Sequence, residues 1–175
     1  MARHRKLIKR AVYVLAPLML VFYGLEQLRV TWSCRDLLSV LSFNVRWYRT
    51  ENGEHRPSDI FCVANAFYSN AFSPSEFTNS PAARVHLFCP GVGRESSRLK
   101  NVNECDYTYV NWEPFFGTNS VPNDYPLIYD RRLSNHRGLG INVVTCGGSC
   151  FWDYRARWLR AFAAKHPEYH VPVAE

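Results

Sequence analysis

The sequence has no internal repeat, no low-complexity tract and no second short pair of cysteines that could complete a metal site. Structural zinc sites are typically built from two such pairs, so the missing spacing argues against a zinc module. Cys146 and Cys150 form the single short pair among six cysteines. We therefore expect no metal ion and no other cofactor. Charged residues are moderate at 21% and aromatic residues are abundant at 15%, which excludes disorder for most of the chain.

Acidic residues are missing from the first ten positions, where basic residues gather. The whole chain has a formal net charge of +6 at pH 7, and without this cluster the remainder is close to neutral. A basic surface spread over the domain is thus not indicated, and we expect no nucleic-acid partner. The cluster consists of Arg3, Arg5, Lys6, Lys9 and Arg10.

No charge interrupts the run Ala11–Leu25, which follows the basic cluster directly. Its helix would rise about 22 Å, against a hydrocarbon core of about 30 Å, and flanking apolar residues lengthen the surface. The positive flank predicts an N-terminus in the cytoplasm. We therefore expect a single-pass inner-membrane protein with its anchor at residues 11–30 and its main domain in the periplasm. The anchor residues are Ala11, Leu15, Leu18, Leu20 and Phe22.

Small residues of the kind that precede a signal-peptidase site are also missing after this run, where Tyr23–Leu28 reads YGLEQL. A cleaved secretory signal is therefore disfavoured. Thr31–Ser33 likewise lacks the small residues of a lipoprotein site before Cys34. A buried core helix remains the alternative to an uncleaved anchor.

Apolar residues at helical spacing continue beyond the anchor and predict an amphipathic helix within residues 31–56. Pro17 and Gly24 should bend the long helix without ending it. Asn52-Gly53 supplies the chemistry of a helix C-terminus, and Pro57 opposes continuation. The expected apolar face consists of Leu37, Val40, Leu41, Val45 and Tyr48.

After residue 57 the apolar segments become shorter, and runs of β-branched and aromatic residues alternate with turn residues. Gly147–Ser149 predicts a tight hairpin loop, and residues 154–165 a short helix. The fold class is therefore α+β: a basic terminus (1–10) and one long N-terminal helix precede a small antiparallel β-sheet domain (57–175). The strands are expected at 85–88, 107–110, 127–129, 141–144 and 150–152.

Several motifs, taken in order, resemble type IV pilins and type II secretion pseudopilins, in particular prepilin-like proteins of planctomycete and verrucomicrobial type. After the anchor stand Cys34-Arg35-Asp36-Leu37-Leu38 and then Tyr48 and Asn52-Gly53 before Pro57. The later motifs are Phe88-Cys89-Pro90, Tyr107–Val110, Pro126–Asp130, Asn135-His136-Arg137-Gly138 and Asn142–Cys150.

This resemblance implies a pilin-like fold and a non-enzymatic structural subunit of a secretion or pilus-type assembly. The implied partners are other copies or other pilin-like subunits, through the N-terminal helix. The leader that a prepilin peptidase cleaves is missing, because Gly24-Leu25-Glu26 follows the apolar run. Gly147 and Ser149 replace the Asp and His of the family's final hairpin, so a calcium site is not carried over.

Cysteines in an exported domain suggest disulfides, and six permit fifteen full pairings. Cys146 could face Cys150 across the hairpin, and Cys62 with Cys89 is a second candidate pair. We expect no catalytic residue: His136 as a base beside Asp130, with Cys146 as nucleophile, is the enzymatic alternative, and a histidine bonding the turn at Arg137-Gly138 is favoured over it. A non-enzymatic alternative is a membrane-tethered module that binds an envelope polymer or protein through aromatic loop residues. These are Tyr107, Tyr109, Trp112, Phe115 and Phe116, which more often form core and cross-strand packing.

Overall fold

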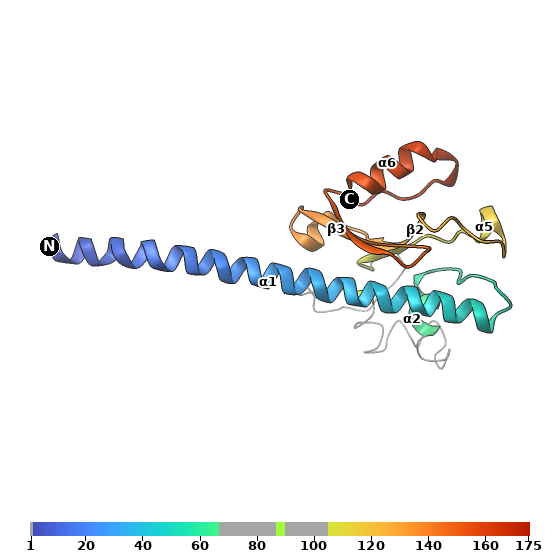
Figure 1. Ribbon diagram of the computed structural model, residues 1–175, viewed down its shortest axis with the longest axis horizontal. Helices are drawn as coiled ribbons and strands as arrows, with labels where there is room; N and C mark the ends of the chain where they lie inside the picture. Colours follow the sequence, from blue (N-terminus) through green and yellow to red (C-terminus); the bar gives the residue numbers. More distant parts are fainter. Residues whose placement is uncertain (1, 67–86, 90–104) are drawn as a thin grey trace.

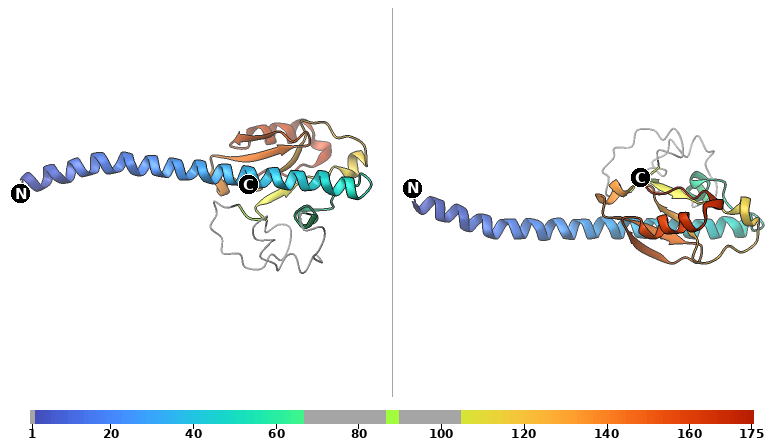
Figure 2. Two further views of the ribbon diagram at one scale, coloured as in Figure 1. Left: turned by 60° about the horizontal axis from the view of Figure 1, so that its bottom comes forward. Right: turned by 90° about the horizontal axis from the view of Figure 1, so that it is seen from above.

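The computed structural model describes residues 2–66, 87–89 and 105–175, with side chains from residue 15 onward except Ala16 and Gln27. Its dominant element is α1 (Ala2–Glu51), a helix of 50 residues that runs without a break through Pro17. The first half of α1 projects from the rest of the molecule, and the second half lies along the domain (Figure 1). The helix is gently curved (Figure 2), as predicted for a long helix with an internal proline.

The C-terminus of α1 is stabilised by the residues that the sequence marks for this role. The side-chain amide of Asn52 donates to the carbonyl of Tyr48 at 2.8 Å. Gly53 follows in the left-handed region, at a φ of 61°, where a residue without a Cβ is favoured. The chain then turns back into α2 (Ile60–Ala66), whose first turn is capped by Asp59 Oδ1 accepting from the Cys62 N–H at 2.9 Å.

A four-stranded antiparallel sheet forms the centre of the domain, with its strands in chain order. The predicted α+β class and long N-terminal helix are therefore confirmed. Leu87 and Phe88, predicted within a first strand, lie outside the sheet, and Val85 and His86 are outside the described residues. The strands are β1 (Tyr107–Tyr109), β2 (Pro126–Asp130), β3 (Gly140–Thr145) and β4 (Cys150–Tyr154).

The sheet lies between two helical layers, with α1 on one face and α6 (Arg157–Lys165) on the other (Figure 1). Every residue of the two central strands β2 and β3 is buried, because both faces of these strands are covered. The edge strand β4 is mostly exposed or half-buried. Short helical turns complete the domain: α5 (Glu113–Phe116), η2 (Leu133–His136) and η3 (Pro167–Tyr169).

The face of α1 that packs on the sheet differs slightly from the predicted one. Leu41 and Val45 are buried as expected, whereas Val40 is 37% exposed. Cys34 and Leu38 join the buried face instead. Cys34 is four residues before Leu38, and Leu38 is three before Leu41, so they lie on one face of the helix. The apolar stripe is thus rotated toward the cysteine, which joins the core.

The hairpin between β3 and β4 and the C-terminal helix form where predicted. Gly148 occupies the left-handed region at a φ of 85°, and the Thr145 N–H donates to the Ser149 carbonyl at 2.9 Å. At the start of α6, the Asp153 carboxylate accepts from the backbone N–H groups of Trp158 and Leu159, each at 2.9 Å. A carboxylate at a helix N-terminus satisfies N–H groups that have no partner within the helix.

The expected inner-membrane location is contradicted. Among the residues that the structure describes, no helix combines the length and the apolar character that a membrane span requires. The uninterrupted apolar run ends at Leu25, where Glu26 and Arg29 form an exposed ion pair at 2.6 Å. The flanking residues therefore do not extend the run of about 22 Å to the hydrocarbon thickness of about 30 Å.

Candidate functional site

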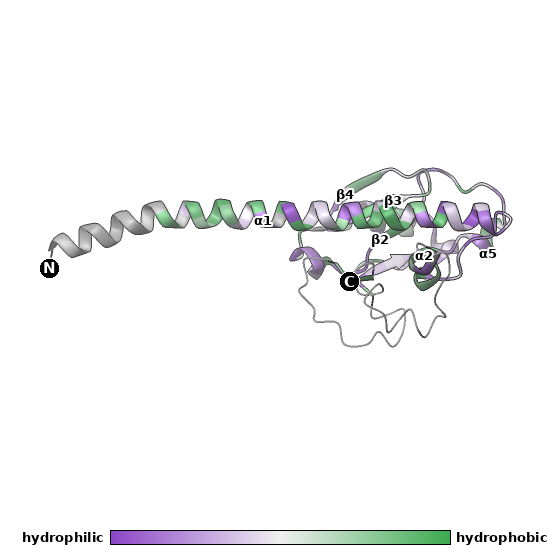
Figure 3. Ribbon diagram, turned by 90° about the horizontal axis from the view of Figure 1, so that it is seen from below, coloured by the Kyte–Doolittle hydropathy of each residue, from purple (hydrophilic) through white to green (hydrophobic). Residues whose placement is uncertain are grey.

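The projecting part of α1 carries large apolar side chains on all sides. Five consecutive residues, Leu18–Phe22, are each between 48% and 71% exposed. Successive helical residues are rotated by about 100°, so five in a row surround the helix axis. Figure 3 shows this hydrophobic section beyond the edge of the domain. The expected anchor residues Leu15, Leu18, Leu20 and Phe22 all belong to it, whereas the side chain of Ala11 is outside the described residues.

A groove with a volume of about 460 Å³ begins where this exposed section meets the domain. The α1 side contributes Leu28 and Trp32, and the sheet side contributes Leu139, Trp152 and Tyr154. Four of these side chains are more than 40% exposed, and Trp152 is 37% exposed. The groove therefore continues the apolar surface of the helix onto the domain.

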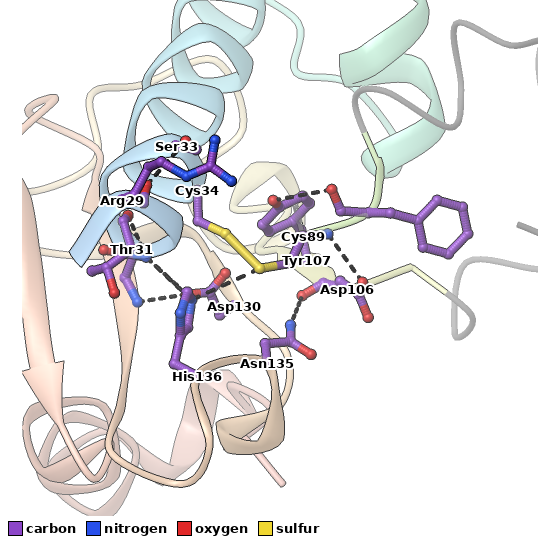
Figure 4. Close-up of a disulfide and its surroundings, with 12 residues drawn as sticks. Arg29, Thr31, Ser33, Cys34, Cys89, Asp106, Tyr107, Asp130, Asn135 and His136 are labelled. Carbon is purple, nitrogen blue, oxygen red and sulfur yellow. Dashed lines mark hydrogen bonds and ion pairs between the residues drawn. A yellow bond between two sulfur atoms is a disulfide. The ribbon is translucent and has the colours of Figure 1, made fainter. Parts of the chain in front are cut away.

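A cluster of four buried side chains lies beneath the groove, and each comes from a different segment. Cys34 is in α1, Cys89 precedes β1, Asp130 ends β2 and His136 ends η2. One ligand atom of each residue, the two cysteine sulfurs, a carboxylate oxygen and an imidazole nitrogen, lies within 4.8 Å of the others. None of the four side chains is more than 3% exposed. Figure 4 shows the Cys34–Cys89 disulfide with Asp130 and His136 beside it. We call these four residues the cysteine–histidine cluster.

Hydrogen bonds around Asp130 hold the polar half of this cluster. Its Oδ2 lies 2.9 Å from His136 Nε2 and accepts the backbone N–H of Asn142 at 2.7 Å. The Asn142 side-chain amide donates to the same oxygen at 3.2 Å and reaches the Thr31 carbonyl of α1 at 3.5 Å. Trp152 covers the histidine edge-on, with ring centroids 5.2 Å apart.

Three polar atoms in the same place have no hydrogen-bond partner among the described residues. They are Asp130 Oδ1, His136 Nδ1 and the Asn142 carbonyl oxygen Oδ1. A buried polar atom without a partner is destabilising by about 1–3 kcal/mol. The cluster therefore has unused capacity to bind a further group.

Asp106 positions Cys89 against the cluster. Its Oδ2 accepts the Cys89 N–H at 3.0 Å, and its backbone carbonyl accepts from the Asn135 side-chain amide at 3.2 Å. One residue thus connects the segment that carries Cys89 to the turn that carries His136 (Figure 4).

The disulfide pairing differs from both candidate pairs. Cys89 is bonded to Cys34, and the candidate partners Cys62, Cys146 and Cys150 are free thiols. The two cysteines of the hairpin do not face each other, because Cys150 pairs across the sheet with Val144 and Cys146 lies beyond the strand end. Cys62 lies on α2, where its sulfur is 3.2 Å from the Ser58 hydroxyl.

Cys146 and Cys150 also have different charged and polar neighbours. Burial raises the pKa of Cys146 to about 12, although Arg56, Arg49 and Arg46 nearby lower it in part. Burial likewise raises the pKa of Cys150, which lies near Arg35 and Ser39. Arg46 and Arg49 lie about three turns of α1 beyond Arg35 and Ser39. A thiol with so high a pKa is a poor nucleophile at neutral pH.

The expected bond from the His136 side chain to the turn at Arg137-Gly138 is not the one that the structure shows. This side chain bonds Asp130 in the interior, and Cys146 is not in the cluster. The alternative set of Asp130, His136 and Cys146 is therefore assembled only in part. The sequence motifs ending in Asp130 and containing His136 pointed to these two residues, but no pattern pointed to Cys34 or Asn142 as their neighbours.

The aromatic loop residues serve mainly as packing. Trp112 is fully buried and donates from Nε1 to the Pro126 carbonyl at 2.8 Å. Its ring contacts Phe115, Phe116 and Tyr125 at centroid distances between 5.1 and 6.1 Å. Tyr107 is also fully buried, Tyr109 is half-buried and Phe115 is 44% exposed. Most of this aromatic surface is therefore buried and cannot contact a polymer or a protein partner.

Comparison with family models, with curated proteins and with solved structures yields no match to this chain.

Proposed function

We propose that this protein is a non-enzymatic, pilin-like structural subunit that assembles with other copies of itself through the projecting half of α1. The observation that carries the proposal is the exposed apolar surface around Leu18–Phe22. A helix that is apolar on all sides is stable in water only when other apolar groups cover it. Among the described residues, the domain covers only the second half of α1, and we infer that the cover comes from another copy.

The occupant that fits this surface is the same helix of further copies. Leucine, methionine and phenylalanine side chains on a straight or gently curved helix interdigitate with an identical helix, as in helical bundles. The groove beside Trp32 and Trp152 continues the surface onto the domain, so a helix from a neighbouring copy can lie along α1 and end on the sheet. The order of motifs that resembles pilins and pseudopilins supports the same arrangement.

A structural role is also consistent with the cysteine–histidine cluster. Its Asp130–His136 pair is enclosed, with the two side chains 0% and 2% exposed. The candidate nucleophile Cys146 is outside this cluster. The alternative function, recognition of a polymer or protein through the aromatic loops, is less well supported because Trp112 and Tyr107 are in the core.

Oligomeric state tests this proposal directly. We expect the full chain to sediment as an oligomer, and Phe22→Glu to shift it toward monomer, because a carboxylate cannot be buried in an apolar helix bundle without a partner. Phe43→Glu is the matched control: Phe43 lies on the same helix and is 67% exposed, against 68% for Phe22, but it lies on the half of α1 that runs along the domain. The measurement is sedimentation velocity at matched concentrations.

A monomeric full chain, or equal effects of the two substitutions, would contradict the assembly role. Thermal unfolding of both variants distinguishes loss of assembly from loss of folding. Because Phe22 contacts little of the domain, Phe22→Glu should leave the unfolding of the monomer close to that of the parent.

A further inference from the structure

We propose that the cysteine–histidine cluster is a zinc site when its cysteines are reduced, and that Cys34 and Cys89 alternate between a disulfide and a pair of metal-bound thiolates. This inference is independent of the proposed assembly function. It rests on the convergence of two sulfurs, one imidazole and one carboxylate in the interior of the fold.

The composition of the site is suited to zinc. Thiolate and imidazole are the preferred ligands of this ion, a carboxylate oxygen is also common, and structural sites have four protein ligands and no open position. The cluster supplies two cysteines, one histidine and one aspartate, all buried. Four ligand atoms around tetrahedral zinc are separated by about 3.3–3.8 Å, given bonds of about 2.0–2.3 Å. The atoms of the cluster lie within 4.8 Å of one another, so small side-chain rotations bring them to this geometry.

The buried polar groups of the cluster are not needed by the disulfide and are suited to binding a metal. A disulfide is apolar and gains nothing from a buried carboxylate and imidazole beside it, and burying those groups is costly. His136 Nε2 lies 4.0 Å from Cys89 Sγ and 2.9 Å from Asp130 Oδ2, so one nitrogen faces two of the other ligands. Asp130 Oδ1 has no partner among the described residues and is available for coordination.

Asn142 and Trp152 provide the surroundings that a metal site needs. The Asn142 amide bonds Asp130 and would keep this carboxylate oriented after His136 turned to the metal, as outer-shell groups do in zinc proteins. Asn142 also lines the groove above, together with Thr31 and Trp152. The groove is therefore the path by which an ion enters.

The exchange balances with a dithiol as the reductant. Two electrons from the dithiol break the Cys34–Cys89 bond, giving two protein thiols and the oxidised, cyclic disulfide of the reductant. Zinc binding then displaces the two thiol protons to solvent, while neutral His136 and ionised Asp130 donate their lone pairs. A disulfide of the same class, acting as the oxidant, reverses the sequence: the ion leaves, the oxidant accepts two electrons and two protons and becomes a dithiol, and Cys34 and Cys89 form their bond again.

The experiment compares the full chain with its cysteines reduced by dithiothreitol, then freed of excess reductant without oxygen, against the oxidised chain. Cobalt(II) is the probe, because thiolate ligands give a charge-transfer absorption and tetrahedral geometry gives intense visible bands. We expect the reduced chain to bind one cobalt ion and to release it to an equivalent of zinc. The oxidised chain should bind none at the same concentration.

Two variants separate this site from adventitious thiol binding. His136→Asn keeps both cysteines and the disulfide, and should lose the tetrahedral spectrum in the reduced state. Cys62→Ser is the matched control, because Cys62 is a thiol outside the cluster, and it should bind cobalt like the parent. If the reduced chain loses its structure without metal, added zinc should restore its circular dichroism.

Each of three results would overturn the proposal. They are a reduced, folded chain that takes up no cobalt, a metal-bound spectrum unchanged by His136→Asn, and a reduced, unfolded chain that zinc does not refold. Sensitivity to Cys62→Ser with indifference to His136→Asn would assign the binding to thiols elsewhere.

Discussion

His136 Nε2 lies 2.9 Å from Asp130 Oδ2, and the two side chains are 2% and 0% exposed. The pair joins the end of β2 to the end of η2, the two segments that precede β3. Without His136, Asp130 Oδ2 would keep only the two Asn142 donors, and without Asp130 the imidazole would lose its carboxylate partner. Their hydrogen bond is therefore a structural link of the domain in the disulfide-bonded state.

His136→Ala should lower the free energy of unfolding by about 3 kcal/mol, because the buried carboxylate keeps its two Asn142 donors but loses the imidazole. Urea unfolding of the oxidised protein with a chelator present excludes any metal contribution. A double-mutant cycle with Asp130→Asn isolates the pair, and its coupling energy should be about 0.5–3 kcal/mol. Additive effects would show that the two residues act independently.

Leu41 anchors α1 to the sheet, so Leu41→Ala should lower the free energy of unfolding by about 2–5 kcal/mol through the cavity that it leaves. Its side chain is fully buried. Phe43→Ala removes a larger side chain from the same helix, but this residue is 67% exposed and the change should cost less than about 0.5 kcal/mol. Chemical denaturation of the two variants measures both changes. Similar losses of the free energy of unfolding would contradict the packing of Leu41, rather than Phe43, against the sheet.

Glu113 should make stability fall in acid. His55 Nδ1 bonds its Oε1 and the Arg56 N–H donates to its Oε2, each at 2.6 Å. The His55 hydrogen bond chiefly, and then the Arg56 N–H, lower the pKa of this carboxyl below its ordinary value of 4.5. A lowered folded-state pKa stabilises the protein above the ordinary value, and this contribution disappears as the pH falls through the folded-state pKa.

The test is the thermal unfolding midpoint of Glu113→Gln between about pH 7 and about pH 3. The parent should lose more of its midpoint over this range than the variant does. Parallel curves would show that Glu113 does not contribute to the acid sensitivity.

Alkylation of the denatured protein should distinguish Cys34 and Cys89 from Cys62, Cys146 and Cys150. Without a reductant, the thiols of Cys62, Cys146 and Cys150 should be modified, and the bonded pair should not. In the native protein, Cys146 should react slowly because burial raises its pKa to about 12. Peptide mass spectrometry checks both statements, and protection of Cys146 together with Cys150 in the denatured protein would restore the hairpin disulfide.

Local patterns predicted much of the fold. Tyr107–Val110 and Ile141–Val144 are β-branched and aromatic, and each lies within or overlaps a strand. Asn52-Gly53 predicted the end of α1 because its chemistry acts within one helical turn. The cluster could not be predicted in the same way, because Cys34, Cys89 and Asp130 are far apart along the chain and meet only through the packing of α1 on the sheet. The apolar run of α1 predicted a membrane anchor, and this prediction was wrong, because no helix among the described residues is long and apolar enough for a span.

The Cys34–Cys89 bond also determines how the molecule bears mechanical load. A pull on the projecting end of α1 and on the C-terminus is transmitted through this bond, since it is the shortest covalent path between them. The two cysteines are 55 residues apart in sequence, so about the last third of α1 and all of α2 lie in a closed loop that the bond bypasses. Reduction opens the loop, and about 190 Å of chain can then be drawn out once α1 has separated from the sheet. The redox state of one cysteine pair thus determines whether a stretched subunit behaves as a short tether or a long one.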